Sequence, residues 1–137
     1  MSARTKARRR ALDLLFEAEQ RQVNVGTLLA ERVETSERPH PLPEYTVTLV
    51  EGVVQRWTAI NEVLTTYSQG WPLERMPAVD RAVLRLGTWE IVWNDEVPDT
   101  VAIAEAVGMV QDLSTDESPK FVNGLLGRVS QVKPTLV

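Results

Sequence analysis

The class of fold is clearest in the stretch "AVDRAVLRLGTWEIVWN" (residues 78–94), where apolar residues recur at helical spacing. One face of the expected helix is apolar along most of its length, through Val79, Ala82, Val83, Leu86 and Trp93. Leu84 and Ile91 add apolar surface on another side. A helix that is apolar on two sides is typical of the centre of a helical protein, so we expect this one to be buried.

Helical periodicity continues on both sides of this stretch. It predicts helices over residues 3–22 and 25–34, one long helix from Pro43 to about Tyr67, a helix capped by Asp99 or Thr100, and a last helix that begins at Ser118 and Pro119. The proline-rich segments "SERPHPLPEY" (36–45) and "SQGWPLERMP" (68–77) separate these helices. No segment alternates with period two for long enough to predict a strand. We therefore expect an all-α domain over residues 1–137, with six to seven helices.

The composition narrows the classes of protein and of site. The chain has no cysteine, which excludes disulfides and thiolate metal sites and fits a reducing compartment. It contains neither a signal peptide nor an apolar run of the ~18 residues that a membrane span requires. The one histidine, His40, has no partner for a metal site or a catalytic dyad, and no glycine loop for phosphate is present. We expect a cytoplasmic protein without a metal or a cofactor.

The chain opens with a dense group of positive charges, "RTKARRRALDLLFEAEQ" (residues 4–20). The chain has a net charge of −4, yet its first ten residues carry five basic side chains and no acidic one. Cations at a helix N-terminus oppose the helix dipole at a cost of roughly 0.3–1 kcal/mol each. We therefore expect the leading turns to stand clear of the core and to meet a polyanion such as a phosphate backbone. A solvated tail that aids solubility is the alternative, and the charges alone do not decide between them.

Four other positions also allow two interpretations. Phe16 lies away from the apolar stripe of the first helix, so it either packs at the edge or contacts a partner. Glu90 falls on an apolar face, where a structural hydrogen bond or ion pair is expected rather than catalysis. Gly124 and Gly127 lie inside a helical pattern, and we expect close approach of another helix to explain them, with proximity to a ligand as the second explanation.

Three blocks in this order and spacing resemble the NusB family of bacterial transcription antitermination factors. They are "ARRRALDLLFEAEQ" (7–20), "VDRAVLRLGTWEI" (79–91) and "SPKFVNGLLGRV" (118–129), and the similarity extends over roughly residues 4–130. The chain departs from the family pattern in "VAIAEAVGMVQ" (101–111), at Ala104, Gly108 and Gln111, and again at Gly127, where an aspartate is usual.

The resemblance implies a fold, and it implies a binding function and not a catalytic one. The fold would consist of two small helical bundles, over about residues 3–69 and 72–131. The function would be antitermination: the family binds the single-stranded RNA element boxA of ribosomal leader transcripts together with NusE, a ribosomal protein, and helps to assemble a complex on RNA polymerase. Family members occur as monomers and as homodimers, and the sequence leaves that state open.

The resemblance also assigns roles to residues. Matched positions predict RNA contacts by Arg4, Lys6, Arg8, Arg9, Arg10, Glu117, Lys120 and Phe121. They predict NusE contacts by Phe16 and Asp80. Phe121 could stack on an unpaired base, with core packing as its alternative, and Asp80 could instead complement the dipole of its own helix.

Two other functions compete with this one. The first is the RNA-binding domain of a ribosomal RNA cytosine methyltransferase, but no nucleotide-binding βαβ pattern occurs up to Val137. The second is a helix-turn-helix protein, but the basic residues cluster at the start of the first helix and not on a later recognition helix.

Overall fold

The computed structural model describes residues 1–34 and 41–136, and the secondary structure of this part is helical throughout. The helices are α1 (Ala3–Arg21), α2 (Val25–Glu34), α3 (Glu44–Gln55), α4 (Trp57–Tyr67), α5 (Ala78–Trp93), α6 (Asp99–Leu113) and α7 (Ser118–Val132). Two short 3-10 turns, η1 (Leu73–Arg75) and η2 (Lys133–Thr135), complete the order. The predicted all-α class is confirmed. The first half of the first predicted proline-rich loop, residues 36–40 with His40, lies outside the described residues.

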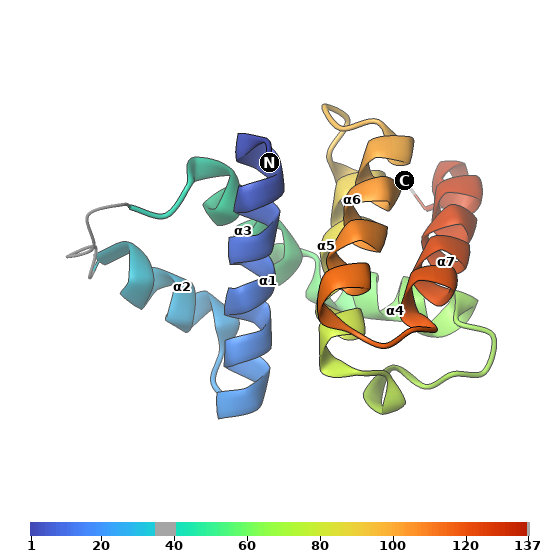
Figure 1. The fold of residues 1–137 in the computed structure, drawn as a ribbon, viewed down its shortest axis with the longest axis horizontal. Coiled ribbons are helices and arrows are strands. Elements are labelled where there is room, and N and C mark those ends of the chain that lie inside the picture. The colour runs from blue at the N-terminus through green and yellow to red at the C-terminus, as the bar shows by residue number, and fades with distance from the viewer. Residues whose placement is uncertain (35–40, 137) are drawn as a thin grey trace.

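The helices form two groups that meet along α5 (Figure 1). The first group contains α1, α2 and α3, and the second contains α4, α5, α6 and α7. The expected boundary near residue 70 is wrong, because α4 packs on α5 and α7 and therefore belongs to the second group. The chain crosses between the groups at Arg56 instead.

The predicted long helix over residues 43–67 is broken at Arg56. This residue leaves helical geometry with φ −110° and ψ 19°, and it separates α3 from α4. A straight helix could not pack on α1 at one end and on α7 at the other, so tertiary packing overrides the local periodicity. Close approach of α3 and α5 also demands Gly52, because a Cβ atom there would overlap the indole ring of Trp89.

Helix α5 is the central element, as its two apolar sides predicted. It packs against α1, α3, α4, α6 and α7. Val83, Leu84 and Ile91 have no exposed surface. Full burial of side chains of this size contributes roughly 1.5–3 kcal/mol each, so this helix carries much of the stability of both groups.

Candidate nucleic-acid interface

The exposed cations of α1 form the first part of the site. Ser2 caps the helix, because its Oγ accepts a hydrogen bond from Thr5 N at 3.1 Å. Arg4 and Lys6 are exposed, while Arg9 and Arg10 are partly exposed. Within the described residues, Lys6 and Arg10 form no ion pair with an acidic side chain. These two charges are therefore available to an anion from outside the molecule.

Arg4 and Arg9 are engaged in pairs at the protein surface. Arg4 Nη2 lies 3.5 Å from Glu96 Oε2, and both side chains are largely exposed. Arg9 Nη2 lies 2.5 Å from Asp112 Oδ2, near the end of α6. Exposed ion pairs are worth only about 0–1 kcal/mol, so either arginine can exchange its carboxylate for a phosphate.

Arg8 corrects the expectation that the leading turns stand clear of the core. Its side chain is 3% exposed, and its guanidinium pairs with Glu90, Nη2 to Oε2 at 2.9 Å, and with Glu105, Nη1 to Oε1 at 3.2 Å. Arg8 therefore joins α1 to α5 and α6 and is not placed to contact RNA. The structural ion pair predicted for Glu90 is confirmed, although the sequence did not reveal its partner.

A polar network surrounds this buried pair. The hydroxyl of Tyr45 donates to Glu90 Oε2 at 2.5 Å, and Thr5 Oγ1 donates to Glu105 Oε1 at 2.6 Å. Burial lowers the pKa of Arg8, but the hydrogen bond to Glu90 and the charges of Glu90 and Glu105 raise it above its ordinary value. Burial and the neighbouring Glu90 carboxylate raise the pKa of Tyr45 well above its usual range, which keeps the hydroxyl protonated. Arg8 and Tyr45 therefore act as fixed donors.

The second part of the site lies on the first turns of α7. Glu117 and Lys120 are exposed. Phe121 is partly buried, and its ring packs edge-to-face on Trp71 with centroids 4.5 Å apart. It lines an open groove of about 600 Å³ with Glu117, Lys120 and Tyr67, the last residue of α4. The ring therefore has both expected environments: one side packs on Trp71, and the rest borders solvent-accessible space.

The two parts are joined through the end of α6. Thr5 meets Glu105 and Arg9 meets Asp112, so α1 and α6 run alongside each other in the same direction (Figure 1). The turn after α6 leads directly to Glu117 and Lys120. A single-stranded nucleic acid that runs along the exposed cations of α1 toward the end of α6 would therefore reach the start of α7.

Asp80 is not at the surface, which corrects its predicted contact with a protein partner. It has no exposed surface, and its two carboxylate oxygens accept hydrogen bonds from Ser114 Oγ at 2.6 Å and Ser118 Oγ at 2.8 Å. Asp80 lies in the first turn of α5, where a negative charge also complements the helix dipole. Its role is to fasten the turn between α6 and α7 to α5, which fixes where α7 begins.

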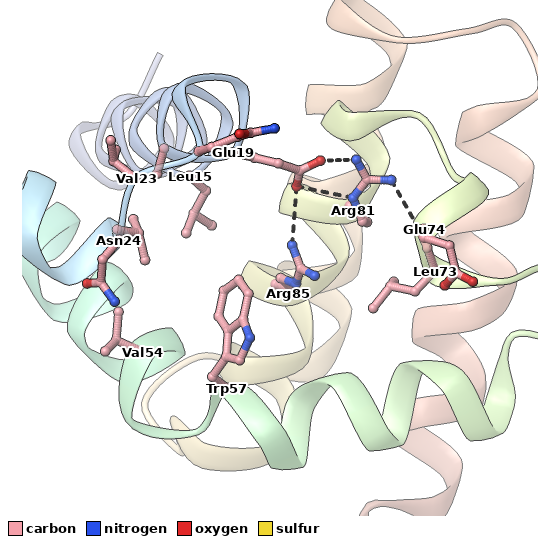
Figure 2. Close-up of a pocket in the computed structure, with 13 residues that line it drawn as sticks. Leu15, Glu19, Val23, Asn24, Val54, Trp57, Leu73, Glu74, Arg81 and Arg85 are labelled. Atoms are coloured by element: carbon pink, nitrogen blue, oxygen red, sulfur yellow. Dashed lines mark hydrogen bonds and ion pairs between the residues drawn. The ribbon is translucent and has the colours of Figure 1, made fainter.

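Phe16 is 38% exposed, on the outer side of α1. Glu19 follows it by three residues, so the two side chains project from the same side of the helix. Glu19 borders a groove of about 870 Å³ between the two helix groups (Figure 2). Local sequence patterns do not predict this groove, because its walls come from α1, α2, α3, α4, η1 and α5.

Two arginines share one carboxylate in this groove. Glu19 Oε2 accepts from Arg81 Nε at 3.1 Å and lies 3.5 Å from Arg85 Nη1, as Figure 2 shows. The Arg85 guanidinium also lies over the ring of Trp57 at 4.2 Å. These contacts connect α1 and α4 to α5. They therefore hold the walls of the groove in place where the two helix groups meet.

Other classes of site are not evident in the part of the chain that the structure describes. No group of three or more histidine, aspartate or glutamate side chains there could hold a metal ion. Among the same residues, no helix combines the length and the apolar character that crossing a membrane requires.

Comparison with known proteins agrees with the geometry. The model of the NusB family matches residues 5–131. The transcription antitermination protein NusB of Pseudarthrobacter chlorophenolicus is 60% identical over 138 residues, covering 100% of this chain and 99% of the relative. The protein of the same name from Streptomyces avermitilis is 50% identical, covering 99% and 96%.

Solved structures share the fold. NusB of T. maritima superposes with a TM-score of 0.82 at 29% identity, covering 95% of this chain and 92% of that one. A chain from a structure of the antitermination factors NusB and NusE in complex with double-stranded RNA gives a TM-score of 0.79 at 26% identity, covering 94% and 96%. The relatives are antitermination proteins, which favours this function over the methyltransferase and helix-turn-helix alternatives.

Proposed function

The chain belongs to the NusB family, and from that membership we propose that it binds boxA-type single-stranded RNA together with NusE. The family is one of antitermination factors and not of enzymes, as the sequence predicted. The observation that carries the proposal is the placement of Lys6 and Arg10 on the solvent-accessible side of α1, where neither cation forms an ion pair among the described residues and Arg10 acts on Asp13 through its charge alone. In this role the protein would act in the cytoplasm and help to assemble an antitermination complex on RNA polymerase.

The RNA contact has an electrostatic and an aromatic component. Arg4, Lys6, Arg9 and Arg10 supply the positive charge on α1, and Lys120 supplies it on α7. Neutralising the phosphates of a single strand releases counterions and makes the affinity depend on salt. Phe121 offers a ring on which one base can stack, and Glu117 offers acceptors for base amino groups.

The NusE contact is proposed for the side of α1 that carries Phe16. An exposed aromatic ring on a helix is a favourable anchor, because burying it on binding removes apolar surface from water. Replacing Phe16 by alanine should weaken NusE binding by about fivefold or more. Val33→Ala is the matched control, because Val33 is exposed on α2 and does not lie on α1. Equal affinity for NusE in both variants would contradict the assignment.

A binding titration tests the proposal as a whole. A boxA RNA oligonucleotide is titrated with the protein alone, with NusE alone and with both, and sedimentation fixes the oligomeric state of each species. We expect the two proteins together to bind more tightly than either alone. Equal affinity for boxA RNA, a scrambled strand and duplex DNA of the same length would contradict the proposal.

A further inference from the structure

The ion pair of Arg9 with Asp112 lies between the two parts of the proposed RNA surface. Arg9 is one of the cations of α1, and Asp112 is in the last turn of α6, just before the turn that leads to α7 (Figure 1). We propose that Asp112 competes with RNA phosphates for the guanidinium of Arg9, and that this internal contact holds the RNA affinity of the protein below what its cations alone would give.

The helix that carries Asp112 does not explain this residue. The C-terminal end of a helix dipole is negative, so an acidic side chain in the last turn destabilises the helix, and α6 has no basic residue there. Asp112 is also the only charged side chain in residues 106–113. Gly108 and Gln111, two of the departures from the family pattern, carry no charge. The charge of Asp112 is therefore offset from another helix, by Arg9.

The stability of the fold does not explain the pair either. The side chain of Arg9 is 26% exposed and that of Asp112 is 58% exposed, and an ion pair in such a position contributes little because water screens it. The same two helices are already joined by Glu105, which pairs with Arg8 and accepts a hydrogen bond from Thr5. Loss of the exposed pair would leave this contact between α1 and α6 in place.

The guanidinium of Arg9 is only partly satisfied by Asp112. The carboxylate accepts from Nη2, whereas Nε is buried and has no hydrogen-bond partner among the described residues. A buried donor without a partner is unfavourable. A guanidinium that turns toward solvent can offer Nε and one Nη together to two oxygens of a phosphate. Phosphate is thus the better partner for Arg9, but it must first displace Asp112.

The other acidic side chains near Arg9 act on it differently. Asp13 lies one turn further along α1, and it interacts with Arg9 and Arg10 through charge alone, without an ion pair among the described residues. Glu105 is engaged by other residues of α1. Asp112 is therefore the acid that an RNA phosphate has to replace, and Asp13 offers a comparison with the same charge in the same region.

This inference rests on the proposed function, and a double-mutant cycle separates the two. The affinity of the protein with NusE for a boxA oligonucleotide is measured for the parent, Asp112→Asn, Arg9→Gln and the variant with both substitutions. Asp112→Asn frees Arg9, so we expect it to tighten binding by about two- to fivefold, the range that an exposed ion pair allows. In the Arg9→Gln background most of this gain should disappear, because the competition no longer exists.

Asp13→Asn is the matched control, because it removes one negative charge near Arg9 without breaking an ion pair. Salt screens such a charge, so we expect the control to change the affinity by less than about twofold. An equal gain for Asp112→Asn in both backgrounds would show a general effect of charge and overturn the proposal. An RNA affinity of Asp112→Asn no higher than that of the parent would also overturn it. Failure of the parent protein and NusE to bind boxA RNA would instead overturn the proposed function.

Discussion

The first turns of α1 contain arginines with opposite roles, and the contrast between Arg8 and Arg10 shows what decides them. Arg8 is buried and paired with Glu90 and Glu105, whereas Arg10 is partly exposed and has no acidic partner among the described residues in ion-pair range. Arg8 lies four residues before Leu12 and seven before Leu15, so it shares a helix face with two buried leucines. The position of a charge around the helix, and not its place in a basic run, decides whether it builds the fold or meets a ligand.

The largest difference between the two positions should appear in stability. Arg8→Ala leaves the Glu90 carboxylate buried without its main partner, and we expect the free energy of unfolding to fall by about 3–5 kcal/mol. Arg10→Ala should change it by less than about 0.5 kcal/mol. Urea denaturation of both variants measures the difference. A loss below about 1 kcal/mol for Arg8→Ala would mean that the buried pair does not hold α1 in place.

The hydroxyl of Tyr45 tests the same network with a smaller change. Tyr45→Phe removes the donor to Glu90 and the acceptor for Asn94 Nδ2, which lies 3.1 Å away, while keeping the ring. We expect a loss of about 1–3 kcal/mol, because Glu90 loses one of its partners but retains Arg8. Thermal unfolding with and without the substitution checks this value. No change in the unfolding midpoint would show that the hydroxyl is replaceable by water.

The exposed cations should affect RNA binding and leave stability alone. The double variant Lys6→Ala, Arg10→Ala should reduce the slope of log affinity against log salt concentration by about 1.4, since each single-strand phosphate contact contributes roughly 0.7. Arg75→Ala is the control, because it removes an exposed charge from η1. Filter binding at several salt concentrations gives the slopes. An unchanged slope in the double variant would remove α1 from the RNA surface.

The smallest effect is expected at the other end of α1. Hydrogen bonds from Arg21 and Arg32 lower the pKa of Glu17 below its ordinary value of 4.5. The carboxylate therefore contributes stability above about pH 4.5, and this contribution is lost as the pH falls through the lowered pKa. Both partners are partly exposed, so Glu17→Gln should cost less than about 1 kcal/mol at pH 7. The variant and the parent should become equally stable near pH 2, and urea melts from pH 2 to 7 measure this convergence.

Much of the secondary structure follows from periodicity, whereas several site residues do not. The apolar pattern of residues 78–94 predicted a buried central helix, and the structure confirms it. The break at Arg56 was missed, because the local pattern continues smoothly into α4 and only packing against α7 requires the turn. The partner contact that the family resemblance predicts for Asp80 is wrong, because the sequence does not show that Ser114 and Ser118 enclose its carboxylate.

The sequence by itself determined the helices, their apolar faces and the membership of the family, because hydrophobic spacing and motifs are local properties of the chain. Tertiary structure alone decided which charges face inward, where the two helix groups divide, and that Gly124 borders open space instead of another helix. Burial and pairing depend on residues far apart in the chain, such as Arg8 with Glu90 and Arg128 with Tyr67, and local spacing carries no record of such partners.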